Sequence, residues 1–120
     1  MKIAVTTTGT TVDDALCQRF GRAPAFLVVD TETGEAHVQA NTQNMNAAQG
    51  AGIQAGQTVV ETGAEALITG HVGPKAFRVL QSAGIAVYTS DAATVKKALE
   101  AFASGDLSPQ DDADVEGHWV

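Results

Sequence analysis

The sequence is poor in cysteine and in long apolar runs. A single cysteine stands among its 120 residues, so the chain cannot form an internal disulfide or supply an all-thiolate zinc or iron–sulfur site. The apolar stretch that follows Lys2 is too short for a signal peptide, and no run approaches the ~18 apolar residues of a membrane span. We therefore expect a cytoplasmic protein that has no membrane partner.

Basic residues are also scarce. Seven Lys and Arg residues stand against 14 Asp and Glu residues, which gives a net charge of −7. A chain this acidic lacks the basic surface of a general nucleic-acid binder, so we expect no nucleic-acid partner. Residues 105–120 hold five of the acids and no Lys or Arg, which leaves a charge of −2 for residues 1–104. We predict one globular domain over 1–104 and an acidic, mobile tail over 105–120.

Motifs of common enzymes are missing as well. The chain has no G-x-x-x-x-G-K-[ST], no C-x-x-C, and no G-x-G-x-x-G after its first predicted strand. None of its serines stands in a G-x-S-x-G context, and the first strand carries no carboxylate that could hold magnesium. The sequence therefore predicts a binding protein that is not an enzyme and has no catalytic residues.

Hydrophobic patterning predicts a β-rich first half. Apolar residues indicate strands over 2–6, 25–30 and 35–40, and turn-forming residues at 31–34 join the last two strands into a hairpin. Residues 12–20 fit a short, irregular helix because two acidic residues stand in its first turn.

The second half alternates helices with strands. Apolar residues at helical spacing predict helices over 48–62, 74–83 and about 95–102, and apolar runs predict strands over 64–69 and 85–89. Helix–strand alternation of this kind requires parallel strands with right-handed crossovers. We predict an α/β fold with a mixed five-stranded sheet, of which the first three strands are antiparallel, covered by helices.

Local signals mark the ends of these helices. Pro74 fits the first position of the second helix. We expect Ser90 or Asp91 to cap the last helix at its start. A glycine is expected to end each helix, and these glycines are Gly63, Gly84 and Gly105.

The segment T-G-H-V-G-P-K-A-F at residues 69–77 is the strongest candidate site. It follows a buried strand, and ligands of such sheets bind beyond the carboxyl ends of parallel strands, here at 6–11, 69–75 and 89–92. The unpaired N–H groups at a helix start favour anions. Lys75 adds a cation, and His71 could coordinate a metal or donate a hydrogen bond. Alternatively, this is a tight turn whose histidine faces water.

The two glycines of this segment have a predicted role of their own. Because glycine has no side chain, Gly70 and Gly73 would let a ligand approach the backbone closely. The backbone of Val72, which lies between them, belongs to the same candidate site.

Two other segments could contribute to binding. Arg19 and Arg22 could hold an anion, or they could pair on the surface with neighbouring aspartates. The polar segment N-T-Q-N-M-N at 41–46 offers Asn44 and the soft thioether of Met45, although an uncommitted loop methionine is more common. We expect Cys17 to be a buried structural residue.

Five ordered blocks of the chain resemble one known family. They are M-K-I-A-V at the start, F-G-R-A-P-A-F-L-V-V-D at 20–30, G-A-G-I at 50–53, A-L-I-T-G-H-V-G-P-K-A-F at 66–77, and A-G-I-A-V-Y-T followed by T-V-K-K-A-L-E-A-F at 83–102. The blocks are similar to those of the dinitrogenase iron–molybdenum cofactor biosynthesis family, whose members are small carriers and scaffolds for metal–sulfur clusters. The resemblance covers residues 1–104 and implies a ribonuclease-H-like fold with helices on both faces of the sheet.

The resemblance also implies a ligand. It is an anionic, molybdenum-containing metal–sulfur cluster held non-covalently or through few ligands. The cluster would be of the molybdenum–copper sulfide type that a family member of similar size carries, or of the iron–molybdenum cofactor type. Donor and acceptor proteins are the implied partners. His71 lies in the loop where some members of the family place a ligand-like histidine, and it would be the residue that coordinates metal. From the candidate segments described above, the cluster-binding set would be Arg19, Arg22, Asn44, Met45, Gly70, His71, Val72, Gly73 and Lys75.

Two other functions fit parts of the sequence. The fold could serve as a cluster-free interaction module that docks protein partners through its acidic tail, which ends in His118, Trp119 and Val120. An enzyme that acts on a phosphorylated metabolite at the start of the helix at Pro74 is the third hypothesis.

Overall fold

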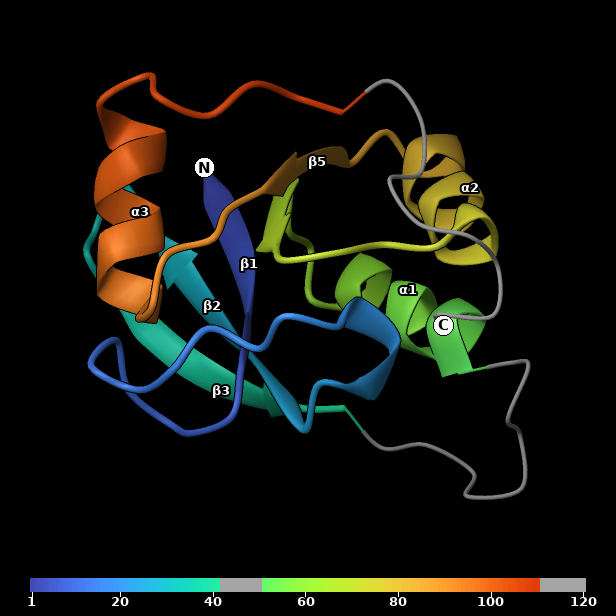
Figure 1. Ribbon diagram of the computed structural model, residues 1–120, viewed down its shortest axis with the longest axis horizontal. Helices are drawn as coiled ribbons and strands as arrows, with labels where there is room; N and C mark the ends of the chain where they lie inside the picture. Colours follow the sequence, from blue (N-terminus) through green and yellow to red (C-terminus); the bar gives the residue numbers. More distant parts are fainter. Residues whose placement is uncertain (42–50, 111–120) are drawn as a thin grey trace.

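The computed structural model describes residues 1–41 and 51–110. This part of the chain forms five strands, three α-helices and one 3₁₀ turn (Figure 1). In chain order they are β1 (Lys2–Thr7), η1 (Phe20–Arg22), β2 (Ala25–Asp30), β3 (Ala36–Ala40), α1 (Ala51–Glu61), β4 (Ala66–Thr69), α2 (Pro74–Ser82), β5 (Ala86–Thr89) and α3 (Val95–Ala103). None of the described helices is both long enough and apolar enough to cross a membrane.

The strands form one mixed sheet in the order β3-β2-β1-β4-β5. β1 pairs with β2, and β2 with β3, in antiparallel register, whereas β4 is parallel to both β1 and β5. The prediction of a mixed five-stranded sheet with three antiparallel first strands is therefore confirmed, while the ribonuclease-H-like label stays a prediction. The carboxyl ends of β1, β4 and β5 meet at one edge of this sheet, which is where ligands bind in such folds.

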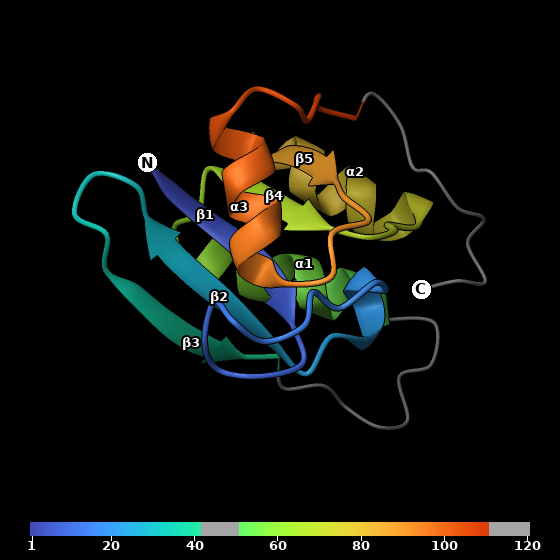
Figure 2. The same cartoon turned by 60° about the vertical axis from the view of Figure 1, so that its left-hand side comes forward.

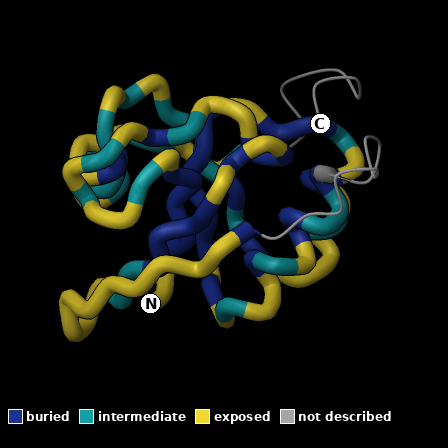
Figure 3. Tube along the Cα trace, turned by 90° about the horizontal axis from the view of Figure 1, so that it is seen from below, coloured by how far each residue is buried: buried dark blue, intermediate teal, exposed yellow. Residues whose placement is uncertain are grey.

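Side-chain alternation along β1 separates two hydrophobic clusters. Ala4 belongs to the cluster beneath α1 and α2, whereas Ile3 and Val5 belong to the cluster beneath α3. Figure 2 shows α3 in front of the sheet with α1 and α2 behind it, which confirms helices on both faces. Figure 3 shows the buried central strands and the exposed edge strand β3. His37 on β3 is exposed, as is expected of a histidine on this strand.

The helix predicted over residues 12–20 is wrong. These residues form turns and isolated bridges, and only η1 at their end has helical geometry. Their backbone N–H groups donate to distant segments: Leu16 to the Ala93 carbonyl oxygen at 3.2 Å and Cys17 to the Thr6 carbonyl oxygen at 2.9 Å. Because these tertiary hydrogen bonds use the donors that a helix would need, local helix propensity is overridden.

The start of α3 also differs from the prediction. Its N-cap is Thr94, whose Oγ1 accepts the N–H of Lys97 at 3.2 Å, rather than Ser90 or Asp91. The two preceding N–H groups donate to carbonyl oxygens of the loop after β1: Val95 to Asp14 at 3.0 Å and Lys96 to Val12 at 2.8 Å. The donors of the first turn of α3 are thus used within the protein. The predicted glycine stops are confirmed, because the three glycines that follow the helices have φ between +77° and +79°.

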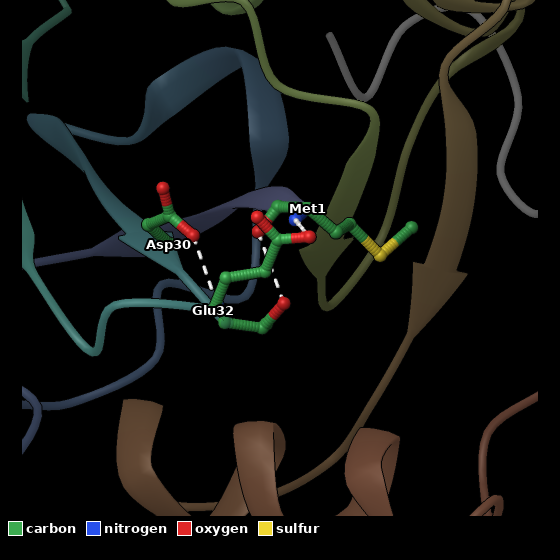
Figure 4. Close-up of polar contacts among 4 residues, drawn as sticks. Met1, Asp30 and Glu32 are labelled. Atoms are coloured by element: carbon green, nitrogen blue, oxygen red, sulfur yellow. Dashed lines mark hydrogen bonds and ion pairs between the residues drawn. The ribbon is translucent and has the colours of Figure 1, made fainter.

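The amino end of β1 is closed by polar contacts (Figure 4). The Met1 carbonyl oxygen accepts the Thr31 N–H at 2.9 Å, and the terminal ammonium lies 3.9 Å from Glu32 Oε1. The Glu32 N–H donates to Asp30 Oδ1 at 2.9 Å, and this hydrogen bond is the main reason that the pKa of Asp30 lies below its ordinary value. These contacts hold the amino end of β1 against the turn that follows β2.

Residues that we predicted to begin the acidic tail lie beside β5. Pro109 forms an antiparallel bridge with Tyr88, and the Gln110 N–H donates to the Val87 carbonyl oxygen at 2.7 Å. Leu107 is half-buried against the cluster beneath α3. The domain boundary at residue 104 stays a prediction, and residues 111–120 lie outside the described part of the chain.

The observed N-cap of α3 gives a stability prediction. Thr94→Ala removes the hydroxyl that accepts the Lys97 N–H, so we expect the free energy of unfolding to fall by about 1 kcal/mol. Thr94→Ser keeps an acceptor and should recover most of this loss. Asp91→Ala, on an exposed residue that caps no helix, should change stability by less than ~0.5 kcal/mol. Urea denaturation measures all three variants, and equal losses at the two positions would contradict the assignment.

Candidate functional site

A cleft of about 300 Å³ opens at the edge where β4 and β5 end. This volume lies at the small end of the range for small-molecule sites. One wall comes from the loop between β4 and α2, and the other comes from the residues that end and follow β5. The lining residues are Gln18, Gly70, His71, Thr89, Ser90, Asp91 and Leu107. The cleft thus falls in two of the three segments where ligands were expected, 69–75 and 89–92.

Backbone pairing joins the first wall to the segment that contains the arginines. The His71 N–H donates to the Gln18 carbonyl oxygen at 2.7 Å, and the Phe20 N–H donates to the His71 carbonyl oxygen at 3.0 Å. Arg19 and His71 are consequently partners in a parallel bridge, and η1 follows directly. Two segments that are some fifty residues apart in the sequence, and that were predicted separately to bind an anion, therefore lie side by side.

Gly70 is required by this pairing. A Cβ atom at position 70 would lie 2.5 Å from the carbonyl oxygen of Gln18 and 2.6 Å from its Cα atom. Contacts this short do not occur for real Cβ atoms, and main-chain atoms cannot move aside as a flexible side chain can. The prediction that Gly70 leaves room for a ligand stays untested, but the close approach of the protein's own backbone already explains a glycine here.

The other residues of the β4–α2 loop have different surroundings. Val72 is fully buried in the cluster beneath α1 and α2, so only its backbone could reach a ligand. Gly73 is buried and forms the N-cap of α2, and Pro74 occupies the first helical turn as predicted. Lys75 is exposed. The loop therefore presents His71 outward while Val72 anchors it to the core, and Lys75 is exposed in the first turn of α2.

Among the described residues, the first N–H groups of α2 have no acceptor, whereas those of α3 donate to carbonyl oxygens of the loop after β1. The first helical hydrogen bond of α2 runs from the Phe77 N–H to the Gly73 carbonyl oxygen at 3.0 Å. Within residues 1–41 and 51–110, the N–H groups of Lys75 and Ala76 have no acceptor. Together with the helix dipole, these two donors give the start of α2 a partial positive charge.

Arg22 is the last residue of η1, Arg19 directly precedes η1, and both are exposed. Arg22 forms no ion pair with Asp13 or Asp14 among the described residues. The carboxylate of Asp14 is used differently, because it accepts the N–H groups of Thr10 at 2.8 Å and Thr11 at 2.9 Å. These hydrogen bonds lower the pKa of Asp14 below 3.8. The surface pairing considered as an alternative for Arg22 is therefore absent from the described structure.

Cys17 does not line the cleft. It is half-buried rather than fully buried, and its Sγ lies 3.5 Å from the Arg19 carbonyl oxygen. Its own carbonyl oxygen accepts the hydroxyl of Thr6 at 2.7 Å, and Thr6 in turn lies 3.0 Å from the hydroxyl of Thr69. These contacts tie the end of β1 to the end of β4, which is a structural role.

The polar segment at 41–46 is described only at its first residue. The Asn41 side chain donates to the Ala23 carbonyl oxygen at 2.7 Å, so the segment begins next to η1. Asn44 and Met45 lie outside the described residues. Within the described part of the chain, no group of three or more His, Cys, Asp and Glu side chains could hold a metal ion. Among the described residues, His71 is therefore not part of a cluster of such ligands.

Sequence reasoning missed several lining residues. Sequence could have identified Thr89, Ser90 and Asp91. They form a polar run at the end of a strand, within the segment 89–92 where ligands were expected. Gln18 and Leu107 carry no local signal, since tertiary pairing brings them to the cleft. Of the predicted site residues, Gly70 and His71 line the cleft, whereas Arg19, Arg22 and Lys75 do not. The cations lie beside the cleft on the segments that flank His71, and this arrangement suits an anionic ligand.

Comparison with known proteins agrees with this fold. The sequence profile of the family described as "Dinitrogenase iron-molybdenum cofactor" matches residues 1–105. The apo form of the orange protein from Desulfovibrio gigas is 40% identical, with 95% of this chain and 96% of that chain covered and a TM-score of 0.90. The NMR structure of a putative NifB protein from Thermotoga is 32% identical over 90% of this chain and 91% of that chain, with a TM-score of 0.75. An uncharacterised protein of Methanocaldococcus jannaschii is 29% identical over 79% of this chain and 82% of its own length.

The close approach at Gly70 gives a second prediction. Gly70→Ala places a methyl group against the Gln18 main chain, so we expect the free energy of unfolding to fall by about 1–3 kcal/mol and the amide resonances of Phe20 and His71 to shift. Adding Gln18→Ala should not restore stability, because the carbonyl oxygen remains. Full rescue in that double variant, measured by urea denaturation, would assign the conflict to the glutamine side chain instead.

The hydrogen bonds of Asp14 give a third prediction. Because its pKa is lowered in the folded state, the ionised carboxylate stabilises the fold above its ordinary pKa of 3.8, and this contribution is lost as pH falls through the folded-state value. The stability difference between the wild type and Asp14→Asn should therefore shrink as pH falls below 3.8. Urea denaturation across this range measures it.

Asp13→Asn is the matched control for Asp14→Asn. The Asp13 side chain is exposed and takes no part in these hydrogen bonds. If the stability difference between the wild type and Asp14→Asn stays constant with pH, or grows on acidification, the carboxylate does not hold the loop through its charge.

Proposed function

The chain belongs to the dinitrogenase iron-molybdenum cofactor family, and on that premise we propose that it binds and carries an anionic, molybdenum-containing metal–sulfur cluster without catalysing a reaction. The cargo is of the molybdenum–copper sulfide type or of the iron–molybdenum cofactor type. Donor and acceptor proteins supply and receive it, and the cytoplasm is where we expect this exchange.

One observation carries the proposal. The parallel pairing of residues 18–20 with the loop after β4 brings Arg19 beside His71, and it continues into η1 with Arg22. Lys75 stands at the start of the next helix. The residues predicted from sequence to bind an anion therefore come from two distant segments. These segments are joined at the edge where α/β sheets bind ligands.

The chemistry of this donor set fits the cargo. A preassembled cluster brings its own bridging sulfides, so the protein need not supply several thiolates, and this chain has only Cys17. A sulfide-rich anion needs hydrogen-bond donors and positive charge. The N–H groups at the start of α2, the imidazole of His71 and the exposed guanidinium and ammonium groups are all of this kind.

One acidic side chain opposes an anion in the cleft. Asp91 is exposed and lines the wall that follows β5. Its charge would repel a polyanion, so the cargo should lie toward the β4–α2 wall, where His71 and the neighbouring cations are. The repulsion by Asp91 and the imidazole on the β4–α2 wall thus favour the same side.

Reconstitution tests the proposal. We expect the protein, mixed with tetrathiomolybdate and copper or with isolated iron–molybdenum cofactor, to retain visible absorption through gel filtration. Arg22→Ala and Lys75→Ala should each speed loss of the cluster about twofold to fivefold, which is the effect of an exposed charge contact. The effect should be larger at low salt, because salt screens the attraction. Protein that stays colourless with both cargos would refute the proposal.

Two controls locate the site. Lys2→Ala removes the same charge at the amino end of β1, where Lys2 is exposed and pairs in register with Asp30, and it should leave retention unchanged. Cys17→Ala should also retain the cluster, because the proposed binding does not use a thiolate. Loss of the cluster in Cys17→Ala would move the site away from the β4–α2 loop.

A further inference from the structure

The wall of the cleft opposite His71 is built by the end of β5. Thr89 is the last residue of that strand, and Ser90 follows it; both are half-buried and line the cleft. The Ser90 N–H donates to the Thr69 carbonyl oxygen at 2.9 Å. The backbone that carries the two hydroxyl groups is therefore fixed to β4, the strand from which the His71 wall also extends.

Each of the two hydroxyl oxygens already accepts a hydrogen bond from the protein. Gln110 Nε2 donates to Thr89 Oγ1 at 3.0 Å, and the Ala92 N–H donates to Ser90 Oγ at 3.1 Å. A hydroxyl group has one hydrogen to donate and two lone pairs that accept. Neither hydroxyl has an acceptor for its own hydrogen among the described residues. What each group has left to offer in the cleft is therefore its O–H donor.

We propose that Thr89 and Ser90 are cargo-binding residues, whose hydroxyl groups donate hydrogen bonds to the sulfides of the bound cluster. This inference rests on the proposed function, and it adds a second wall to the site. An anionic acceptor strengthens a hydrogen bond relative to a neutral one. The two hydroxyl groups thus contribute to binding although they carry no positive charge. They do so on the side of the cleft where the carboxylate of Asp91 would repel the anion.

Gln110 is a positioning residue in this arrangement. Its backbone N–H donates to the Val87 carbonyl oxygen at 2.7 Å, and its side chain reaches Thr89 from there. The Pro109–Tyr88 bridge holds the same segment against β5, and Leu107 forms part of the cleft wall. Leu107 and Gln110 lie beyond residue 105, where the match to the family profile ends. This part of the wall therefore distinguishes the chain from what the profile describes.

Variants of Thr89 and Ser90 test the donor role. After reconstitution with tetrathiomolybdate and copper, we expect Thr89→Val and Ser90→Ala each to speed cluster loss about tenfold, as is typical when a hydrogen bond to a charged group is removed. Thr89→Ser keeps the O–H group and should behave like the wild type. Thermal unfolding of each variant without cargo shows whether it is folded.

Gln110→Glu separates donation from simple packing. A carboxylate at position 110 can only accept, so it would take the Thr89 hydrogen and leave no donor for the cargo while keeping the contact. Cluster loss should be as fast as in Thr89→Val. Ser108→Glu adds the same charge on an exposed residue two positions away and is the matched control, in which loss should change less than in Gln110→Glu.

The outcomes distinguish this inference from the proposed function. If the wild type retains the cluster and Thr89→Val and Ser90→Ala retain it equally well, the inference is overturned and the proposed function stands. Equal effects of Gln110→Glu and Ser108→Glu would also overturn it, because charge alone would then explain the loss. A wild type that stays colourless overturns the proposed function and the inference together.

Discussion

Backbone pairing between residues 18–20 and the loop after β4 is the contact on which the candidate site depends. The segment between β1 and η1 has no regular secondary structure of its own, so hydrogen bonds to other elements must hold it. The two bonds to His71 fix its carboxyl-terminal end, and they require a residue without a side chain at position 70. Without this pairing, Arg19 and Arg22 would lie on a segment that nothing holds beside His71.

The distribution of unused donors makes this edge asymmetric. Both α2 and α3 begin near the carboxyl ends of parallel strands, yet the loop after β1 supplies acceptors to the first turn of α3 alone. At α2, proline removes one N–H, and the next two have no acceptor among the described residues. Carbonyl oxygens of the protein therefore neutralise the start of α3, whereas the start of α2 keeps its partial positive charge. Of the two residues that carry these α2 donors, Lys75 is exposed and Ala76 is fully buried.

Sequence could predict the elements whose hydrogen bonds are local, and it failed where backbone hydrogen bonds join distant segments. The alternation of Ile3, Ala4 and Val5 and the placement of Pro74 follow from local geometry, so strands, faces and helix ends could be predicted. The helix predicted over 12–20 and the cap predicted at Ser90 or Asp91 were wrong, because Cys17 and Val95 donate to segments far away in sequence.

The candidate site could likewise be predicted only in part from the sequence. Its two candidate anion-binding segments could be named from glycines, proline and cations, but their pairing could not. Gln18 and Leu107 reach the cleft, and Gln110 reaches Thr89, only through tertiary contacts. A site assembled this way from many weak donors suits carriage. Structural zinc sites in zinc-finger peptides bind their metal with free energies of about 10–16 kcal/mol. Single hydrogen bonds to charged groups contribute about 1.5–3 kcal/mol, and exposed charges contribute less. Binding that is divided among such contacts can be undone one contact at a time, which permits transfer to an acceptor without breaking a metal–protein bond at every step.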